Sequence, residues 1–395
     1  MTRKLIAMLL TAGTLHGAYA QTTNDHEKFL ENKTLFEELT NIKKKQDKFN
    51  LYLNMHGSFD ANFRDGFQEG AFTMRQLRIE AKGNVNEWLS YRYRQRLNRS
   101  NDGSGNIDNL PTSIDIAGIG VNFGKGFSIF AGKQCAAYGG IEFDLNPIEI
   151  YEYSDMVENM SNFMTGLNIG YDMTPTQQLN FQILDSRNGS FNSTYGVEVT
   201  EGEPPTLESG KLPLVYTLNW NGNFSDVYKT RWSASIMSEA KNEKMYYYAL
   251  GNELNLGKFN MFFDFMYSKE GIDRKGIITG MTGKMNGHNA SDVRYMSLVT
   301  KLNYRFLPKW NLFVKGMYET ASLEKAHENL EKGKYRTSWG YFAGLEYYPM
   351  KTNLHFYLTY VGRSFDYTAR AKALGETDYS TNRVSVGFIY QLPVF

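Results

Sequence analysis

The chain has little of what most folds rely on for covalent or helical stability. Its single cysteine, Cys135, allows no internal disulfide and no cysteine-ligated metal cluster. No run of about eighteen apolar residues is present, although each helical membrane span needs one. Lys and Arg number 43 against 42 Asp and Glu, whereas binding to nucleic acid requires a strongly basic surface. These absences argue against a disulfide-stapled domain, a helical membrane protein and a nucleic-acid partner.

Catalytic and metal-binding motifs are also lacking. No G-x-S-x-G elbow and no phosphate-binding loop occurs. The histidines that follow residue 20 show no metal-ligand spacing between any two of them, being His26, His56, His288, His327 and His355. A dyad built from separate strands stays open, with His355 as its first candidate, but an ordinary polar role is favoured. We therefore expect no enzyme activity, no metal and no cofactor.

The N-terminal residues predict an exported protein. The basic pair Arg3-Lys4 precedes an apolar run that ends near Leu15, and Ala18-Tyr19-Ala20 follows. This is the pattern of a secretory signal peptide. The run is too short for a helix to cross a bilayer of about 30 Å. We expect residues 1–20 to be removed after export through the Sec pathway.

Residues 21–48 predict a short amphipathic helix on the periplasmic side. Leu35, Leu39 and Ile42, continued by Phe49, repeat with a nearly heptad spacing. This helix could form a coiled coil that helps three barrels associate, or it could pack at the periplasmic mouth of one barrel. The second reading is slightly favoured, because about two or three heptads are marginal alone.

The rest of the chain alternates apolar and polar residues over short segments. Leu167, Ile169 and Tyr171 alternate with glycine, asparagine and glycine. The same pattern recurs at 51–55, 179–183, 214–220, 259–265, 310–314 and 354–358. Alternation of this kind predicts strands with one apolar and one polar face. In lipid such strands must close into a barrel, because open edges would leave backbone groups unpaired.

Connection lengths separate a membrane barrel from a secreted sandwich, which also alternates. Short turns are expected at about 83–87, 124–126, 174–176, 257–258, 307–309 and 349–353. Longer polar segments run at about 99–111, 139–161, 187–212, 269–291, 321–334 and 365–379, with short exceptions near 61–70 and 240–244. Short turns at one end and long loops at the other are typical of outer-membrane barrels. The sequence predicts an all-β, transmembrane antiparallel barrel of about sixteen strands over residues 49–395, with an aqueous lumen.

The strand register predicts which charged residues face the lumen. On segment 89–96, Leu89 and the two tyrosines face lipid, so Arg92, Arg94 and Arg96 form a ladder with rungs about 7 Å apart. Guanidinium groups at each rung would lower the barrier for anions. The predicted pore-lining bases are Arg78, Lys82, Arg92, Arg94, Arg96, Lys133, Lys301, Arg305, Lys315, Arg336, Arg363 and Arg383, with Arg231 in addition. Fewer acids turn inward, namely Asp60, Glu80, Glu253, Asp264, Glu319 and Glu346.

The segment 139–161 is the expected constriction loop, and it is acidic. Its acids include Glu142, Asp144, Glu149 and Glu152. They could cancel the basic wall at the narrowest point. A charged lumen could equally serve only to set a transverse field, so anion preference is a hypothesis at this level.

Several short motifs accompany the strand and loop rhythm. They are Gln76-Leu77-Arg78 leading to Gly83, Ala131-Gly132-Lys133-Gln134, Gly139-Gly140-Ile141-Glu142 and Tyr153-Ser154. With them the chain resembles, over about residues 50–395, the phosphate-selective porin O and P family in the form found in Bacteroidetes-like bacteria. The resemblance implies a sixteen-stranded barrel that forms trimers, a loop folded inward and a preference for anions such as phosphate. We therefore expect a porin in the bacterial outer membrane that lets small hydrophilic solutes diffuse passively. The alternative is a barrel that acts in adhesion or scaffolding through its long loops.

Overall fold

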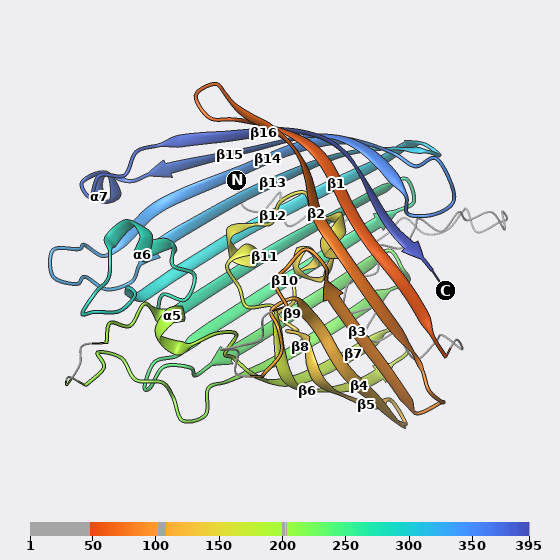
Figure 1. Cartoon of the computed structure of the whole chain (residues 1–395), viewed down its shortest axis with the longest axis horizontal. Helices are drawn as coiled ribbons and strands as arrows, with labels where there is room; N and C mark the ends of the chain where they lie inside the picture. The colour runs from red at the N-terminus through yellow and green to blue at the C-terminus, as the bar shows by residue number, and fades with distance from the viewer. Residues whose placement is uncertain (1–47, 102–107, 200–201, 203, 395) are drawn as a thin grey trace, which may run out of the picture. The chain divides into compact units, whose positions relative to one another are not determined.

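The fold is a closed antiparallel β-barrel (Figure 1). The computed structural model describes residues 48–101, 108–199, 202 and 204–394, and sixteen strands form within these ranges. Each strand pairs with the next along the chain, and β1 closes the sheet by pairing with β16. The predicted fold class is therefore confirmed. The expected signal peptide and nearly all of the expected helix at 21–48 lie outside the described residues.

The elements follow one another in a simple up-and-down order. The strands are β1 Asn50–Phe63, β2 Phe67–Asn84, β3 Leu89–Arg96, β4 Ile114–Gly124, β5 Phe127–Cys135, β6 Phe163–Thr174, β7 Gln177–Asp185, β8 Leu214–Phe224, β9 Tyr228–Met237, β10 Met245–Leu256, β11 Phe259–Ile272, β12 Ser291–Leu307, β13 Trp310–Leu323, β14 Gly333–Tyr347, β15 His355–Tyr367 and β16 Tyr379–Pro393. Short helices occupy the longer connections, namely α3 Ile141–Asp144, η3 Pro147–Glu149, α4 Asp155–Glu158, α5 Phe191–Tyr195, α6 Ile277–Thr282 and α7 Ala369–Lys372. In the described part of the chain, no helix has the length and apolarity to cross a membrane.

Connections alternate between short and long, as the sequence predicts. The predicted short turns all separate an even-numbered strand from the next one. One further short turn, at 225–227 between β8 and β9, was not predicted. Ser225 and Asp226 adopt φ values of 56° and 58° there, and the side chain of Asn223 accepts a hydrogen bond from the Asp226 amide at 2.9 Å. The sequence hides this turn because it contains neither glycine nor proline.

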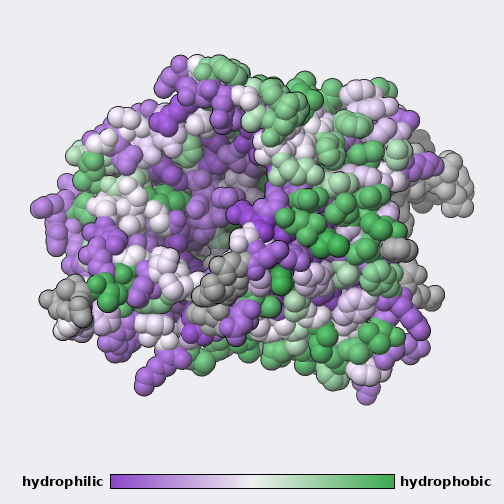
Figure 2. Space-filling view, viewed as in Figure 1, coloured by the Kyte–Doolittle hydropathy of each residue, from purple (hydrophilic) through white to green (hydrophobic). Residues whose placement is uncertain are grey.

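Alternation along the strands places polar side chains on the inner face and apolar side chains on the outer face. Arg92 and Arg94 on β3 are each 1% exposed, whereas Leu218 on β8 and Val386 on β16 are more than half exposed. Figure 2 shows hydrophilic side chains around a hollow and apolar side chains gathered on the outer surface beside it. Since the sheet has no free edge, its backbone groups pair with each other and the apolar side chains face lipid.

A charge placed on the outer face tests this orientation. Leu218 lies near the middle of β8 and points outward. We expect Leu218→Arg to destabilise the barrel by about 2–4 kcal/mol, because the guanidinium enters the hydrocarbon. The matched control is Leu212→Arg in the connection between β7 and β8, where Leu212 is exposed. Equal unfolding free energies for the two variants in lipid vesicles would contradict the assignment of faces.

Candidate solute path and constriction loop

The connection from β5 to β6, residues 136–162, is here called the inner loop, because it contacts strands far along the barrel wall. The amides of Ile141 and Glu142 donate to the two carboxylate oxygens of Asp264 on β11, at 2.8 and 2.7 Å. Beside this contact, β10 carries Gly251, where an added Cβ would lie 2.7 Å from the Cα of Gly140. A carboxylate and a glycine therefore fix the start of the inner loop against β10 and β11.

Aromatic packing fixes the middle of the inner loop. Tyr151 stacks on Phe313 of β13 with ring centroids 5.1 Å apart, and it meets Tyr357 of β15 edge to face at 4.8 Å. The lumen-facing wall that receives the loop is more apolar than the register predicts, with buried side chains at Phe262, Met266, Val299, Phe313, Met317 and Phe342. Apolar residues on both faces of these strands are a further signal in the sequence for the inward-folded loop that the family resemblance implied.

Ion pairs add to this packing, and they use the acids predicted at the constriction. Glu142 pairs with Lys315, Asp144 lies 3.5 Å from Arg231, Glu149 lies 3.7 Å from His355, and Glu152 lies 3.0 Å from Arg383. With the exception of His355, their partners are bases that the register places on the wall. These acids face the strands that hold the inner loop.

Asp155 at the start of α4 makes the densest of these contacts. Its carboxylate meets Arg336 at 2.5 Å and Arg363 at 2.8 Å, and Arg363 also reaches Glu319 at 3.0 Å. Burial raises the pKa of Asp155, but Arg336 and Arg363 outweigh it and hold that pKa below its ordinary value. The carboxylate therefore stays charged and ties the inner loop to β14 and β15.

The opposite side of the barrel carries the arginine ladder, and its rungs share a carboxylate that the sequence analysis did not count. Asp115 on β4 lies 2.9 Å from Arg78, 3.3 Å from Arg94 and 2.7 Å from Arg96. The sequence analysis expected guanidinium groups that are all available to anions. The structure instead shows that the ladder shares a carboxylate. Asp115 was overlooked because it lies between two isoleucines at the beginning of a strand.

Glu80 on β2 is a second carboxylate that pairs with bases of this wall, and it lies nearer than Arg78 to the turn between β2 and β3. It accepts from Arg92 at 2.8 Å and lies 3.8 Å from Lys82. We call Arg78, Lys82, Arg92, Arg94 and Arg96 the basic wall. Its five bases face two carboxylates, Glu80 and Asp115, so positive charge remains in excess on β2–β4.

The remaining predicted bases divide between the two sides. Lys133 on β5 extends the basic wall and pairs with Asp108 at 2.9 Å. Lys301 on β12 lies beneath the inner loop, with its ammonium 4.5 Å from the ring centre of Phe313. Arg305, further along β12, lies 5.0 Å from the ring of Tyr348. The structure therefore places the predicted bases in two groups rather than along one path.

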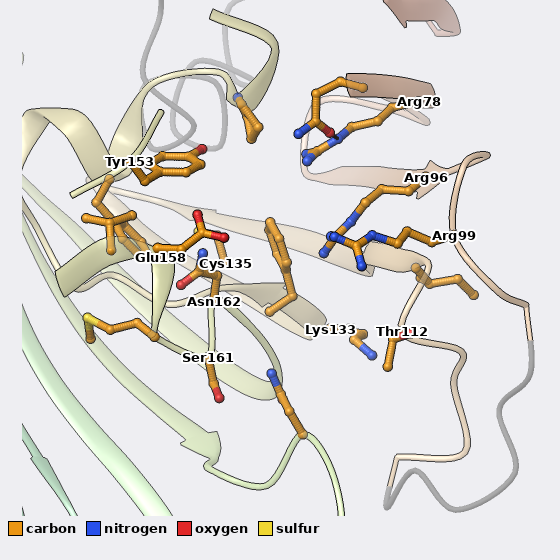
Figure 3. A pocket seen from close by; sticks show the side chains of 18 of the residues that line it. Arg78, Arg96, Arg99, Thr112, Lys133, Cys135, Tyr153, Glu158, Ser161 and Asn162 are labelled. Atoms are coloured by element: carbon orange, nitrogen blue, oxygen red, sulfur yellow. Dashed lines mark hydrogen bonds between the residues drawn. The ribbon is translucent and has the colours of Figure 1, made fainter. Parts of the chain in front are cut away.

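A cavity of about 350 Å³ separates the basic wall from the inner loop (Figure 3). In that view Arg78, Arg96 and Arg99 lie on one side, and Tyr153 and Glu158 of the inner loop lie on the other. Two lining bases, Arg99 and Arg187, were not predicted, because they lie in connections where no strand register assigns a direction. The cavity is lined mainly by one wall and three long connections.

Comparison with known proteins decides the family. The profile of the phosphate-selective porins O and P matches residues 49–392. The chain belongs to this family. It is thus a porin of the bacterial outer membrane, as the sequence analysis expected. None of the curated proteins matches it.

Solved structures share the barrel of this porin at low sequence identity. The outer membrane channel DcaP of Acinetobacter baumannii superposes with a TM-score of 0.60 at 13% identity, covering 88% of this chain and 99% of that one. The anion-selective porin from Comamonas acidovorans gives 0.54 at 10% identity, covering 87% and 99%. A trimer form of OmpT from Vibrio cholerae gives 0.52 at 10% identity, covering 87% and 100%. At these identities the likeness establishes the fold.

The contact between the inner loop and β10 can be tested at Gly251. The Cβ of Gly251→Ala would press on the backbone of Gly140 and Ile141, so we expect the inner loop to move toward the lumen. Overpacking of this kind lowers the free energy of unfolding by about 1–3 kcal/mol. Because the displaced inner loop would narrow the lumen, the single-channel conductance should also fall. The control is Gly316→Ala on β13, where the nearest atom to an added Cβ is 3.7 Å away. Conductance equal to that of the control would disprove the contact.

Proposed function

We propose that this porin is a passive diffusion channel that prefers anions, and that solutes pass between the basic wall and the inner loop. The observation that carries the proposal is the distribution of countercharge. One carboxylate, that of Asp115, is shared by three arginines on the solute side. Glu142, Asp144, Glu152 and Asp155 of the inner loop pair with bases on strands β9 and β13–β16 instead, whereas Glu158 lines the cavity. The loop therefore leaves the excess positive charge of the basic wall largely uncancelled.

Arg78 and Arg96, the bases of this wall that line the cavity, would each offer the anion a weak site. Guanidinium groups donate hydrogen bonds to oxyanions and stay charged at all physiological pH values. Because Asp115 already occupies part of the donors of Arg78 and Arg96, a solute would be bound weakly and released easily. Conduction requires such a balance between entry and exit. The family name points to phosphate as one such anion, and Lys82 and Arg92 would continue its path along the wall.

The proposal extends to assembly and export. We propose a homotrimer embedded in outer-membrane lipid, for which the trimer form of OmpT is a structural precedent. We propose removal of residues 1–20 during export, with residues 21–48 on the periplasmic side. The proposal assigns no catalytic step and no cofactor to the chain.

Removal of charge from the basic wall tests the anion preference. We expect Arg78→Gln and Arg96→Gln each to lower the ratio of chloride to potassium permeability by up to about sixteenfold, because one charge about 5 Å away in water changes the partitioning of each ion by a factor of about four in opposite directions. Reversal potentials in a potassium chloride gradient across a planar bilayer measure this ratio. Arg294→Gln is the control, because Arg294 alternates with the buried Val293 and Tyr295 on β12 and does not line the cavity. Cation preference in the unaltered porin would refute the proposal.

Glu158 gives the preference a pH dependence. Burial raises the pKa of Glu158, and Glu152 raises it further, while Arg99 opposes them. As the pH falls from neutral toward about 4, Glu158 takes up a proton earlier than an ordinary glutamate does. Loss of its negative charge should increase the chloride preference.

The variant Glu158→Gln separates this effect from general titration. It should show the higher chloride preference already at neutral pH, and its preference should rise less on acidification. Glu331→Gln, in the exposed connection between β13 and β14, is the matched control and should titrate like the unaltered porin. Identical pH profiles for all three proteins would remove Glu158 from the solute path.

A further inference from the structure

The cavity beside the basic wall has two faces of different chemistry. Arg78, Arg96, Arg99 and Lys133 supply a basic face. The facing surface is mixed: Tyr153, Met160 and Phe163 contribute apolar groups, and Glu158, Ser161 and Asn162 lie among them. A path built for inorganic ions alone would be expected to have polar groups all round. Here an apolar surface is kept within reach of cations.

The two faces meet at Phe163, the first residue of β6. The guanidinium carbons of Arg94 and Arg96 lie 5.2 and 5.7 Å from the centre of its ring. An anion held by Arg96 would therefore have an aromatic surface beside it. Arg99 makes no ion pair within the described ranges and adds a cation at the rim of the same cavity.

A small inorganic anion would leave part of this site unused. Phosphate keeps its hydration wherever it meets no donor, so contact with the apolar groups of Tyr153, Met160 and Phe163 would not strengthen its binding. An organic anion can place its charged group on the arginines and its apolar group against Phe163 and Met160. Removal of that apolar surface from water is favourable in proportion to its area. The volume of about 350 Å³ falls within the range of small-molecule sites.

We propose that this cavity is a binding subsite for small organic carboxylates that carry an aromatic or branched apolar group, which bind there in preference to inorganic phosphate. The inference rests on the proposed anion path and names the class of solute that the path selects. The carboxylate faces Arg96 and Arg99, and the apolar group faces the inner loop.

Current block in planar bilayers tests this with the complete porin. Benzoate, acetate and inorganic phosphate are added separately to a potassium chloride bath, and the concentration that halves the chloride current is measured. Benzoate and acetate share the carboxylate and differ in the ring. We expect benzoate to block at a concentration about tenfold lower than acetate or phosphate, from partial burial of the ring. Equal half-blocking concentrations for benzoate and acetate would overturn the subsite, as would tighter block by phosphate.

Substitutions in the apolar face locate the effect. Met160→Gln and Phe163→Gln should each raise the half-blocking concentration of benzoate toward that of acetate. Phe191→Gln on α5 removes an aromatic ring outside the cavity lining and should leave benzoate block unchanged. Unchanged benzoate block in both cavity variants would also overturn the subsite.

The two proposals fail separately. The reversal potential of the unaltered porin reports the anion preference, and the comparison of benzoate with acetate reports the subsite. If a cavity variant does not fold, the comparison of benzoate with acetate in the unaltered porin still decides whether the subsite exists. An anion-selective porin that treats benzoate and acetate alike would keep the proposed function and lose the subsite.

Discussion

The structure depends on complete pairing of the backbone within the barrel. Hydrocarbon offers no hydrogen bonds, so an unpaired strand edge in lipid would cost several kcal/mol for each group. Pairing of β1 with β16, in register from Tyr52 with Pro393 to Phe63 with Asn382, removes the edge. Closure also fixes the register of every strand. Because side chains alternate with a period of two, the register decides which charges enter the lumen.

Charges brought inside a barrel need partners, and this porin supplies them unequally. The inner loop carries carboxylates such as Glu142 and Asp155 to one side, where they pair with Lys315, Arg336 and Arg363. The basic wall pairs with Asp115 and Glu80. The inner loop thus supplies the negative charge that pairs with the bases of β13–β15. The proposed anion selectivity depends on this, because those carboxylates do not pair with the basic wall. Apolar packing of Tyr151 on Phe313 helps to hold the inner loop against β13.

Much of the barrel could be predicted from the sequence because alternation and turn chemistry are local. The turn at 257–258 is marked by its glycine, whereas the turn at 225–227 lacks such a mark and was missed. The inward direction of Arg92 and Arg94 follows from the lipid-facing Tyr91 and Tyr93, which alternate with them. Asp115, the partner of Arg94, could not be found in this way, because it lies on another strand. Arg99 belongs to a connection with no register at all.

The sequence by itself determined the strands, their faces and the alternation of short and long connections, because each depends on neighbouring residues and on the period of the pleat. Only the tertiary structure decided which acid meets which base. The inner loop contacts residues more than a hundred positions away, such as Asp264, and Gly251 matters only because Gly140 lies against it. Ion pairing across a lumen depends on distance in space, which spacing along the chain does not specify.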